Sequence, residues 1–199
     1  MNIFVLNECP TQSAKEMCDK HIVKMPIETA QMLSTVHRML DGQPYIDRGK
    51  SGRKVKRWRH KTDLAFPQGP LLYKATMMNH PCTIWARQCY GNYRWLAEHG
   101  IALSDEYTRR YGRRHGSLSI LRYCYYNVPQ NLSTDASQTA FAQAMPDDLK
   151  VSGDAVSAYR QYYIREKARF ATWKTPAKMP NWFFEGISSS GLTYVPMSV

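Results

Sequence analysis

Residues 18–31 read CDKHIVKMPIETAQ and place ionisable side chains inside an apolar, helix-forming run. In a helix, His21, Lys24 and Glu28 share one face within two turns, because they fall at i, i+3 and i+7. Such a face can supply an acid, a base or an amine nucleophile. The ordinary alternative is a solvated Lys24–Glu28 pair worth ~0.3 kcal/mol beside a half-buried, hydrogen-bonded His21. The rest of the chain has to decide between these interpretations.

Length and composition predict a folded, basic protein. The 199 residues suffice for one domain with a substantial core, and 43% hydrophobic with 12% aromatic residues are typical of a globular chain. Lys and Arg number 27 against 16 Asp and Glu, which gives a net charge of +11. This excess favours polyanionic partners, with nucleic acid ahead of an anionic membrane surface.

Targeting and cysteine patterns point to a soluble protein. No run approaches the ~20 apolar residues of a membrane span, and the apolar residues 3–6 lack the flanks of a signal peptide. We therefore expect a cytoplasmic protein, in the host cytoplasm if a phage encodes it. The five cysteines contain no C-x-x-C pair, which argues against a disulfide framework and a structural zinc. We expect reduced, mostly buried thiols, no metal and no cofactor.

Helical patterns dominate the chain. Residues 2–6 are rich in β-branched and aromatic side chains and predict a short, buried extended segment. A capping-box pattern at 13–16 predicts a helix starting near residues 11–14, and Pro26 predicts a kink at Met25 or a second helix starting there. Further helices are expected over 79–111, capped by Asn79 and divided at Gly100, over 117–126 and over 154–173, with a loop at 127–153 that holds one helical turn at 139–144.

These patterns predict an all-α fold, a compact single-domain helical bundle with a short extended N-terminal segment and an irregular C-terminal tail. The helical domain spans residues 1–174 and includes a basic loop or arm at 41–70. The tail, 175–199, should pack on the body through its aromatic residues 182–184, because isolated exposed aromatics are costly.

Two cationic clusters are candidates for nucleic-acid contact. The first is a mobile, glycine-containing segment in which Trp58 is placed to stack on or wedge beside a base. The second closes a helix, where cations also favour the helix dipole, although its size exceeds what a dipole needs. A solvated charge run is the alternative for the first cluster. The residues are Arg48, Lys50, Arg53, Lys54, Lys56, Arg57, Trp58, Arg59 and Lys61 in the first cluster, and Arg109, Arg110, Arg113 and Arg114 in the second.

His80 stands at the start of a predicted helix, in the turn Asn79-His80-Pro81. One interpretation is a contact with DNA or with the active site, because the backbone N–H groups of a helix N-terminus also attract phosphate. The other is a capping or packing role for the turn. Both interpretations stay open.

Several chemistries lack their sequence motifs. The chain has no G-x-G-x-x-G after a strand, no Walker-type loop, no H-E-x-x-H and no deaminase signature. Nucleotide-driven and zinc-driven reactions are therefore poorly supported. Acid/base chemistry with a carboxylate and catalysis by an amine remain.

Three features together resemble the pyrimidine-dimer DNA glycosylases of the phage endonuclease V type and their shorter microbial relatives. These are an extended segment at 2–6, an early helix with clustered ionisable residues at 19–31, and a stretch that opens NHPCTIW at 79–85 and ends in RRYG at 109–112. The resemblance covers about a third of the chain, and the region after residue 115 has no counterpart. It implies a small, basic, all-α protein that binds double-stranded DNA with an extruded base.

The resemblance also implies a bifunctional glycosylase/AP lyase. An N-terminal α-amine attacks C1′, a carboxylate stabilises the sugar cation and assists β-elimination, and arginines hold kinked DNA. An α-amine titrates near pH 8, so a usable fraction is unprotonated at neutral pH, and a Schiff base needs no metal.

The chain departs from this family pattern at two points. The family uses the amine of residue 2, whereas Asn2 is bulkier than residues usually uncovered by removal of Met1, so the amine belongs to Met1 or is blocked. Lys20 or Lys24 then replaces it if burial lowers its pKa. The catalytic carboxylate is assigned to Glu28 because it faces His21 and Lys24, with Asp19 and Glu16 as substitutes.

Other functions remain open. A glycosylase-like fold can modify thymine or 5-hydroxymethyluracil in place in phage DNA, and the extra C-terminal third fits a second substrate pocket. A non-catalytic DNA- or RNA-binding protein would need only the charge. A membrane-surface protein is disfavoured, because the cations do not line one face of an amphipathic helix. No obligate protein partner is inferred.

Overall fold

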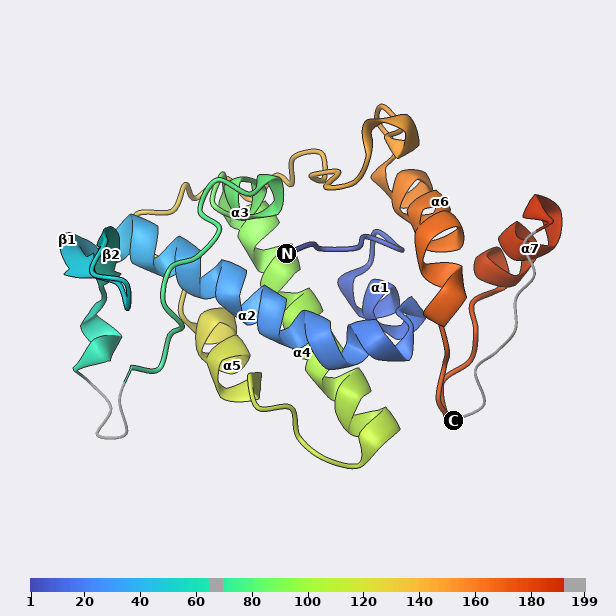
Figure 1. Ribbon diagram of the computed structural model, residues 1–199, viewed down its shortest axis with the longest axis horizontal. Helices are drawn as coiled ribbons and strands as arrows, with labels where there is room; N and C mark the ends of the chain where they lie inside the picture. Colours follow the sequence, from blue (N-terminus) through green and yellow to red (C-terminus); the bar gives the residue numbers. More distant parts are fainter. Residues whose placement is uncertain (65–69, 192–199) are drawn as a thin grey trace.

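The computed structural model describes residues 1–64 and 70–191, and helices form its frame (Figure 1). The fold is mostly helical, as predicted, but it is not all-α, because two strands pair in an antiparallel sheet. None of the described helices is long and apolar enough to cross a membrane. In chain order the main elements are α1 (Pro10–Glu16), α2 (Asp19–Asp41), β1 (Gln43–Arg48), β2 (Lys54–Arg59), α3 (Pro81–Ala86), α4 (Tyr90–Tyr111), α5 (Leu118–Tyr126), α6 (Ala155–Lys167) and α7 (Asn181–Ser190).

Helix α2 is the central element, and α4 crosses it (Figure 1). Gly100 of α4 lies where three helices meet. A Cβ there would come within 2.8 Å of Thr29 Cγ2 in α2 and within 2.6 Å of Leu121 Cδ2 in α5. The predicted division at Gly100 is therefore wrong, because the glycine allows close helix packing, and the interruption lies between α3 and α4.

Helix α2 runs without interruption through Pro26, so no second helix begins there. The chain leaves helical geometry earlier, at Met17 and Cys18, whose ψ angles are 142° and 162°. Proline removes one donor from the helical ladder. His115 Nε2 lies 3.2 Å from the carbonyl oxygen of Val23, in the turn before the proline. A side chain from outside the helix thus supplies a hydrogen bond beside Pro26.

The N-terminal segment is buried, as predicted. Ile3, Val5 and Leu6 are fully buried and belong to the main core. The segment is not a regular strand, since Phe4 has a positive φ of 40°. It therefore enters the core as an irregular extended chain held by side chains around it.

The C-terminal part is more regular than predicted. Residues 181–190 form α7, so the prediction of an irregular tail is wrong for this stretch. Phe183 is fully buried, and Trp182 Nε1 donates to Glu16 Oε2 at 2.8 Å. Phe184, in contrast, is 64% exposed. Residues 192–199 of the predicted tail lie outside the described residues.

The connection between α5 and α6 and the extent of α6 also differ from the prediction. Residues 139–144 carry no helical turn, and a short 3-10 helix forms at Asp147–Leu149 instead. Helix α6 ends at Lys167, and a 3-10 turn at Ala168–Phe170 follows it.

The predicted basic loop or arm is a β-hairpin. Strands β1 and β2 pair from Gln43 opposite Arg59 to Arg48 opposite Lys54. Successive side chains of a strand point to opposite faces, so Lys54, Lys56 and Trp58 lie on one face of β2 and Val55, Arg57 and Arg59 on the other. Gly52 takes a positive φ of 76° at the turn. Residues 65–69 of the predicted arm lie outside the described residues.

Arg38 of α2 anchors the hairpin to the body. Its guanidinium donates to both carboxylate oxygens of Asp63, at 2.9 and 2.7 Å. It also donates to the carbonyl oxygens of Trp58 at 2.9 Å, Leu72 at 2.8 Å and Tyr73 at 2.6 Å. One buried cation thus fixes the end of β2 and the segment after the hairpin against α2.

Candidate active site

Glu28 lies at the centre of a cluster formed by the N-terminus and α2. Glu28 as a whole residue is only 9% exposed. The backbone N–H of Asn2 donates to Oε2 at 3.0 Å, and the α-amine of Met1 lies 3.8 Å from the same oxygen. Lys24 Nζ lies 3.0 Å from Oε1, so both carboxylate oxygens are engaged. The cluster joins a carboxylate to two amines, one from the main chain and one from a side chain.

Asn2 holds the N-terminus in this position. Its side chain donates to the carbonyl oxygen of Ala144 at 2.8 Å, and its Oδ1 accepts from the N–H groups of Ile3 at 2.7 Å and Phe4 at 3.2 Å. The side chain therefore turns the chain sharply and ties residue 2 to a distant loop. Asn2 is thus better described as a positioning residue, with its backbone nitrogen next to Glu28.

His80, at the start of α3, is close enough to the N-terminal amine and to Glu28 for their charges to act on it. Its Nδ1 accepts the N–H of Cys82 at 3.2 Å, so His80 is the N-cap, a role we assigned to Asn79. Burial lowers the pKa of His80 below its usual range, the N-terminal amine lowers it further, and Glu28 partly opposes the shift. The capping interpretation is confirmed, and the same side chain lies near the amine and the carboxylate.

The other predicted catalytic residues serve different contacts. His21 is buried, hydrogen-bonds through Nδ1 to the Tyr163 hydroxyl and stacks on Phe4 with ring centroids 4.3 Å apart. Burial lowers its pKa to about 3, so the ring is neutral at physiological pH. Lys20 places Nζ over the Phe170 ring, 4.8 Å from the centroid. His21 lies on the predicted helix, but its ring contacts Tyr163 of α6, Phe4 of the N-terminal segment and Phe170 after α6.

Asp19 and Glu16 hold the C-terminal part of the chain. Asp19 forms an ion pair with Arg110 at 2.9 Å and accepts the N–H of Lys174 at 2.8 Å. Glu16 accepts from Trp182 and pairs with Arg160. Both carboxylates have partners that stabilise the fold, and this makes them poor substitutes for Glu28.

The second cationic cluster divides in two. The Arg110 side chain is fully buried between Asp19 and Glu106, so it cannot reach a ligand. Arg109, Arg113 and Arg114 are exposed, and Arg109 also pairs with Glu106. The prediction of phosphate contact therefore stands for three of the four arginines.

The hairpin presents its cations to solvent. Arg57 and Trp58 are half-buried, whereas the remaining residues of the first cluster, all of them Lys or Arg, are exposed. Lys56 Nζ lies 5.2 Å from the centroid of the Trp58 ring, so the indole face already carries a cation. The exposed members are Arg48, Lys50, Arg53, Lys54, Lys56, Arg59 and Lys61.

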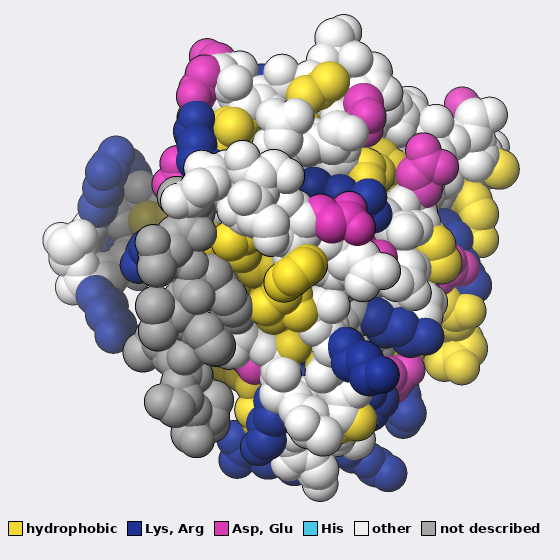
Figure 2. All heavy atoms as spheres, turned by 90° about the vertical axis from the view of Figure 1, so that its right-hand side faces the viewer, with side chains coloured by type: hydrophobic (Ala, Val, Ile, Leu, Met, Phe, Trp, Pro, Cys, Tyr) yellow, Lys and Arg dark blue, Asp and Glu magenta, His cyan; other side chains and the backbone are white. Residues whose placement is uncertain are grey.

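Exposed apolar residues on α2 were not predicted. Val23 and Ile27 are 45% and 42% exposed, one turn apart on α2. Each directly precedes one member of the Lys24–Glu28 pair, and two β-branched residues at i and i+4 beside an ionisable pair are the sequence pattern that could have found them. Figure 2 shows the face that carries α6 and α7, where Lys and Arg side chains gather over the lower part with apolar side chains among them.

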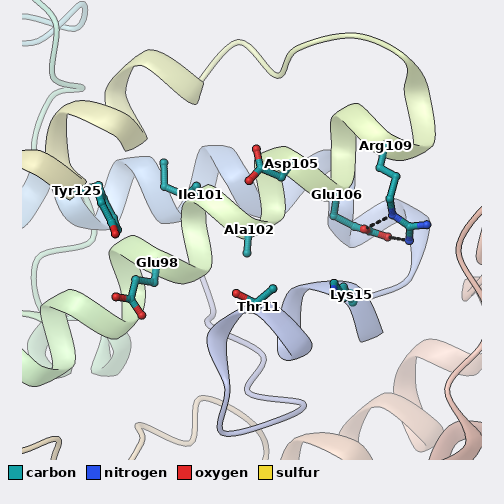
Figure 3. Close-up of a pocket in the computed structure, with 9 residues that line it drawn as sticks. All are labelled: Thr11, Lys15, Glu98, Ile101, Ala102, Asp105, Glu106, Arg109 and Tyr125. Atoms are coloured by element: carbon teal, nitrogen blue, oxygen red, sulfur yellow. Dashed lines mark hydrogen bonds and ion pairs between the residues drawn. The ribbon is translucent and has the colours of Figure 1, made fainter.

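A separate pocket of about 380 Å³ lies between α1, α4 and α5 (Figure 3). Its ionisable lining is mixed and mainly acidic, with Glu98, Asp105 and Glu106 against Lys15 and Arg109. Figure 3 shows Glu106 paired with Arg109 at one end. The acidic excess does not suit a phosphate backbone, and of the predicted site residues only Arg109 lines this pocket.

The arrangement defines a class of site, a buried carboxylate next to an amine in a basic helical protein. The family model of the pyrimidine dimer DNA glycosylases matches residues 1–118. The chain therefore belongs to the pyrimidine dimer DNA glycosylase family. No curated protein and no solved structure matches the chain. The matched stretch contains the whole Glu28 cluster and the hairpin, whereas α6 and α7 lie beyond it.

Proposed function

We propose that this protein is a DNA N-glycosylase and AP lyase that excises damaged or modified pyrimidines through an amine nucleophile. The observation that carries the proposal is the position of the main-chain nitrogens at Glu28 Oε2, 3.0 Å for Asn2 and 3.8 Å for the Met1 amine. If Met1 is removed, the Asn2 nitrogen becomes the amine. Whether the chain begins at Met1 or at Asn2, its N-terminal amine thus faces the same carboxylate.

The chemistry needs an amine and a base in contact. The amine attacks C1′ of the deoxynucleoside, and the electron pair of the glycosidic bond leaves with the base. The attacking amine loses a proton, and cleavage of the C1′–O4′ bond with protonation of O4′ opens the sugar ring to an iminium. The iminium makes the C2′ protons acidic, and a base that removes one expels the 3′ phosphate by β-elimination; water then releases the sugar from the amine. Glu28 is suited to stabilise the cationic sugar and to accept the C2′ proton. Lys24 is the second candidate nucleophile, because its Nζ is 3.0 Å from Glu28 Oε1.

Double-stranded DNA is the proposed substrate. The exposed cations of the hairpin and of the α4 end supply sequence-independent phosphate contacts. Val23 and Ile27 offer exposed apolar surface on α2, next to Lys24 and Glu28 in sequence, which suits contact with an extruded base. His80, half-buried at the start of α3, is placed to contact the sugar-phosphate near the amine.

Borohydride trapping tests the mechanism. The protein is incubated with duplexes carrying a pyrimidine dimer or an abasic site, reduced, digested, and the adduct is located by mass spectrometry. We expect the adduct on the N-terminal residue or on Lys24, with Glu28→Gln retaining DNA binding and losing turnover. Glu185→Gln, an exposed carboxylate on α7, is the matched control and should behave as wild type. Absence of a covalent adduct on every substrate would remove the amine mechanism.

Modification of thymine or 5-hydroxymethyluracil in place is the second candidate, because residues 119–199 lie beyond the family match. Strand cleavage of dimer-containing DNA supports excision, whereas a mass gain on the base without cleavage supports modification. A non-catalytic nucleic-acid-binding protein predicts neither product, and in that case Glu28→Gln changes nothing.

A further inference from the structure

The structure brings together three metal-binding side chains where the hairpin meets the end of α2. His37 and Asp41 are one turn apart on α2, and His60 follows β2. One nitrogen of each imidazole and one carboxylate oxygen of Asp41 lie within 4.8 Å of one another. Both histidines are almost fully buried, with exposed fractions of 2% and 4%. None of the three belongs to the Glu28 cluster.

His60 provides the strongest indication. Its Nε2 is buried and has no hydrogen-bond partner among the residues that the structure describes. Its Nδ1 accepts the backbone N–H of Thr62 at 3.3 Å and lies 2.9 Å from the Thr62 hydroxyl. Ligation through Nε2 therefore requires the ring proton to move to Nδ1, where the Thr62 hydroxyl can accept it in place of the N–H contact. A buried polar atom without a partner is costly in a folded protein, and a metal ion would satisfy it.

The other two side chains are held by hydrogen bonds of the kind that orient metal ligands. The Tyr93 hydroxyl lies 2.8 Å from Nε2 of His37 and fixes that ring. Asp41 accepts the backbone N–H groups of Gln130 at 2.8 Å and Asn131 at 3.0 Å. The two imidazole rings meet nearly at right angles, with centroids 5.6 Å apart.

The charges around the cluster also suit a cation. Arg38 and Lys61 are close enough to act on His60, but the carboxylates of Asp41 and Asp63 oppose them. The local charge is therefore balanced before a cation enters.

We propose that His37, Asp41 and His60 bind one divalent ion of the zinc class, which ties the basic hairpin to α2. Two imidazoles and a carboxylate are a donor set that suits Zn²⁺, Co²⁺ or Ni²⁺, whereas Mg²⁺ and Ca²⁺ prefer oxygen donors alone. In tetrahedral zinc sites donor atoms lie roughly 3.3 Å apart, so the side chains need to close by about 1–1.5 Å. Water supplies the fourth position. The lack of a C-x-x-C or H-E-x-x-H motif does not bear on this site, because its ligands come from a helix and from a distant strand end.

Metal binding to the intact, untagged protein tests this proposal. After treatment with a chelator and dialysis, we expect one Zn²⁺ per chain by metal analysis, a Co²⁺ spectrum typical of tetrahedral coordination, and no comparable binding of Mg²⁺. Asp41→Asn keeps a hydrogen-bond acceptor for Asn131 and should weaken zinc binding at least tenfold. His60→Gln should abolish it, whereas His115→Gln, a buried histidine elsewhere, should retain it.

Hydrogen exchange gives a readout independent of enzymatic activity. Zinc should slow amide exchange within residues 43–60 in wild type and not in Asp41→Asn. A wild-type protein that binds no stoichiometric zinc refutes the site, however the variants behave, and so does equal zinc affinity in wild type and Asp41→Asn. Borohydride trapping in the presence of chelator is judged separately, since the proposed ion takes no part in the Glu28 chemistry.

Discussion

Three buried histidines should make this protein sensitive to mild acid. Burial lowers the pKa of His21 to about 3 and those of His37 and His99 to about 4. In the unfolded chain each histidine titrates near 6.5. Between these values the unfolded state binds more protons than the folded state, so the free energy of unfolding falls as the pH drops below about 6.5 and levels off below the folded pKa values.

The size of the effect follows from the shifts. Lowering the pH from 8 to 5 costs about 2 kcal/mol for each histidine that stays neutral in the folded state, or about 6 kcal/mol for three independent groups. Domains of this size are typically stable by 5–15 kcal/mol. The protein should therefore lose a large part of its stability between pH 8 and pH 5, even though most of its carboxylates are still ionised.

Urea unfolding at pH 8 and pH 5, in the presence of a chelator, measures this loss. His99→Leu provides the control, because His99 is 1% exposed and its Nδ1 contacts only the carbonyl oxygen of Pro10 among the partners described. The variant has its own cost, but its loss between the two pH values should be smaller by about 2 kcal/mol. A wild-type free energy that hardly changes between pH 8 and pH 5, or an unchanged pH dependence in His99→Leu, would refute the reasoning.

Three further predictions concern the frame and the hairpin. Arg38→Leu should destabilise the protein by about 3–5 kcal/mol in urea unfolding, because it leaves the half-buried Asp63 carboxylate and the carbonyl groups that Arg38 now binds without their partner; a loss below about 1 kcal/mol would contradict the anchoring role. Gly100→Ala should cost about 1–3 kcal/mol, since the added methyl overlaps two neighbouring helices, and an unchanged melting temperature would argue against that close packing. Replacing the exposed hairpin cations Lys54, Lys56 and Arg59 by Gln should reduce the salt dependence of DNA binding, measured by fluorescence anisotropy. The slope of log K against log salt should fall by roughly 0.9 for each phosphate that is no longer neutralised. Lys150→Gln, far from the hairpin in sequence, should leave this slope unchanged.

Local patterns in the sequence were sufficient for much of the fold and for the pairing of Lys24 with Glu28. Helical spacing identified the face that carries Lys24 and Glu28, and these two residues do form an ion pair next to the N-terminus. The same spacing could not show that residues from α6 would enclose His21, because Tyr163 is 142 positions away in the chain. Long-range packing decided the environment of each residue on that face.

Breaker residues misled where tertiary contacts compensate for them. Pro26 and Gly100 both lie inside helices. Near Pro26 the His115 side chain hydrogen-bonds to the carbonyl oxygen of Val23, and Gly100 lies at a close contact between helices. Charge misled at the hairpin, since eight cations concealed the alternation of Val55, Arg57 and Arg59 with the residues between them. The ligand cluster of His37, Asp41 and His60 was not visible in the sequence, because it depends on where β2 ends relative to α2.

The C-terminal cover of the early charged residues has a consequence for comparing such proteins. The signature of the family stops at residue 118, but Trp173 donates to the carbonyl oxygen of Glu16, and Lys174 and Thr172 bind Asp19. A fragment cut at the signature boundary would leave these groups open to water and should aggregate or melt early. The stretch that identifies the family is thus shorter than the stretch that folds.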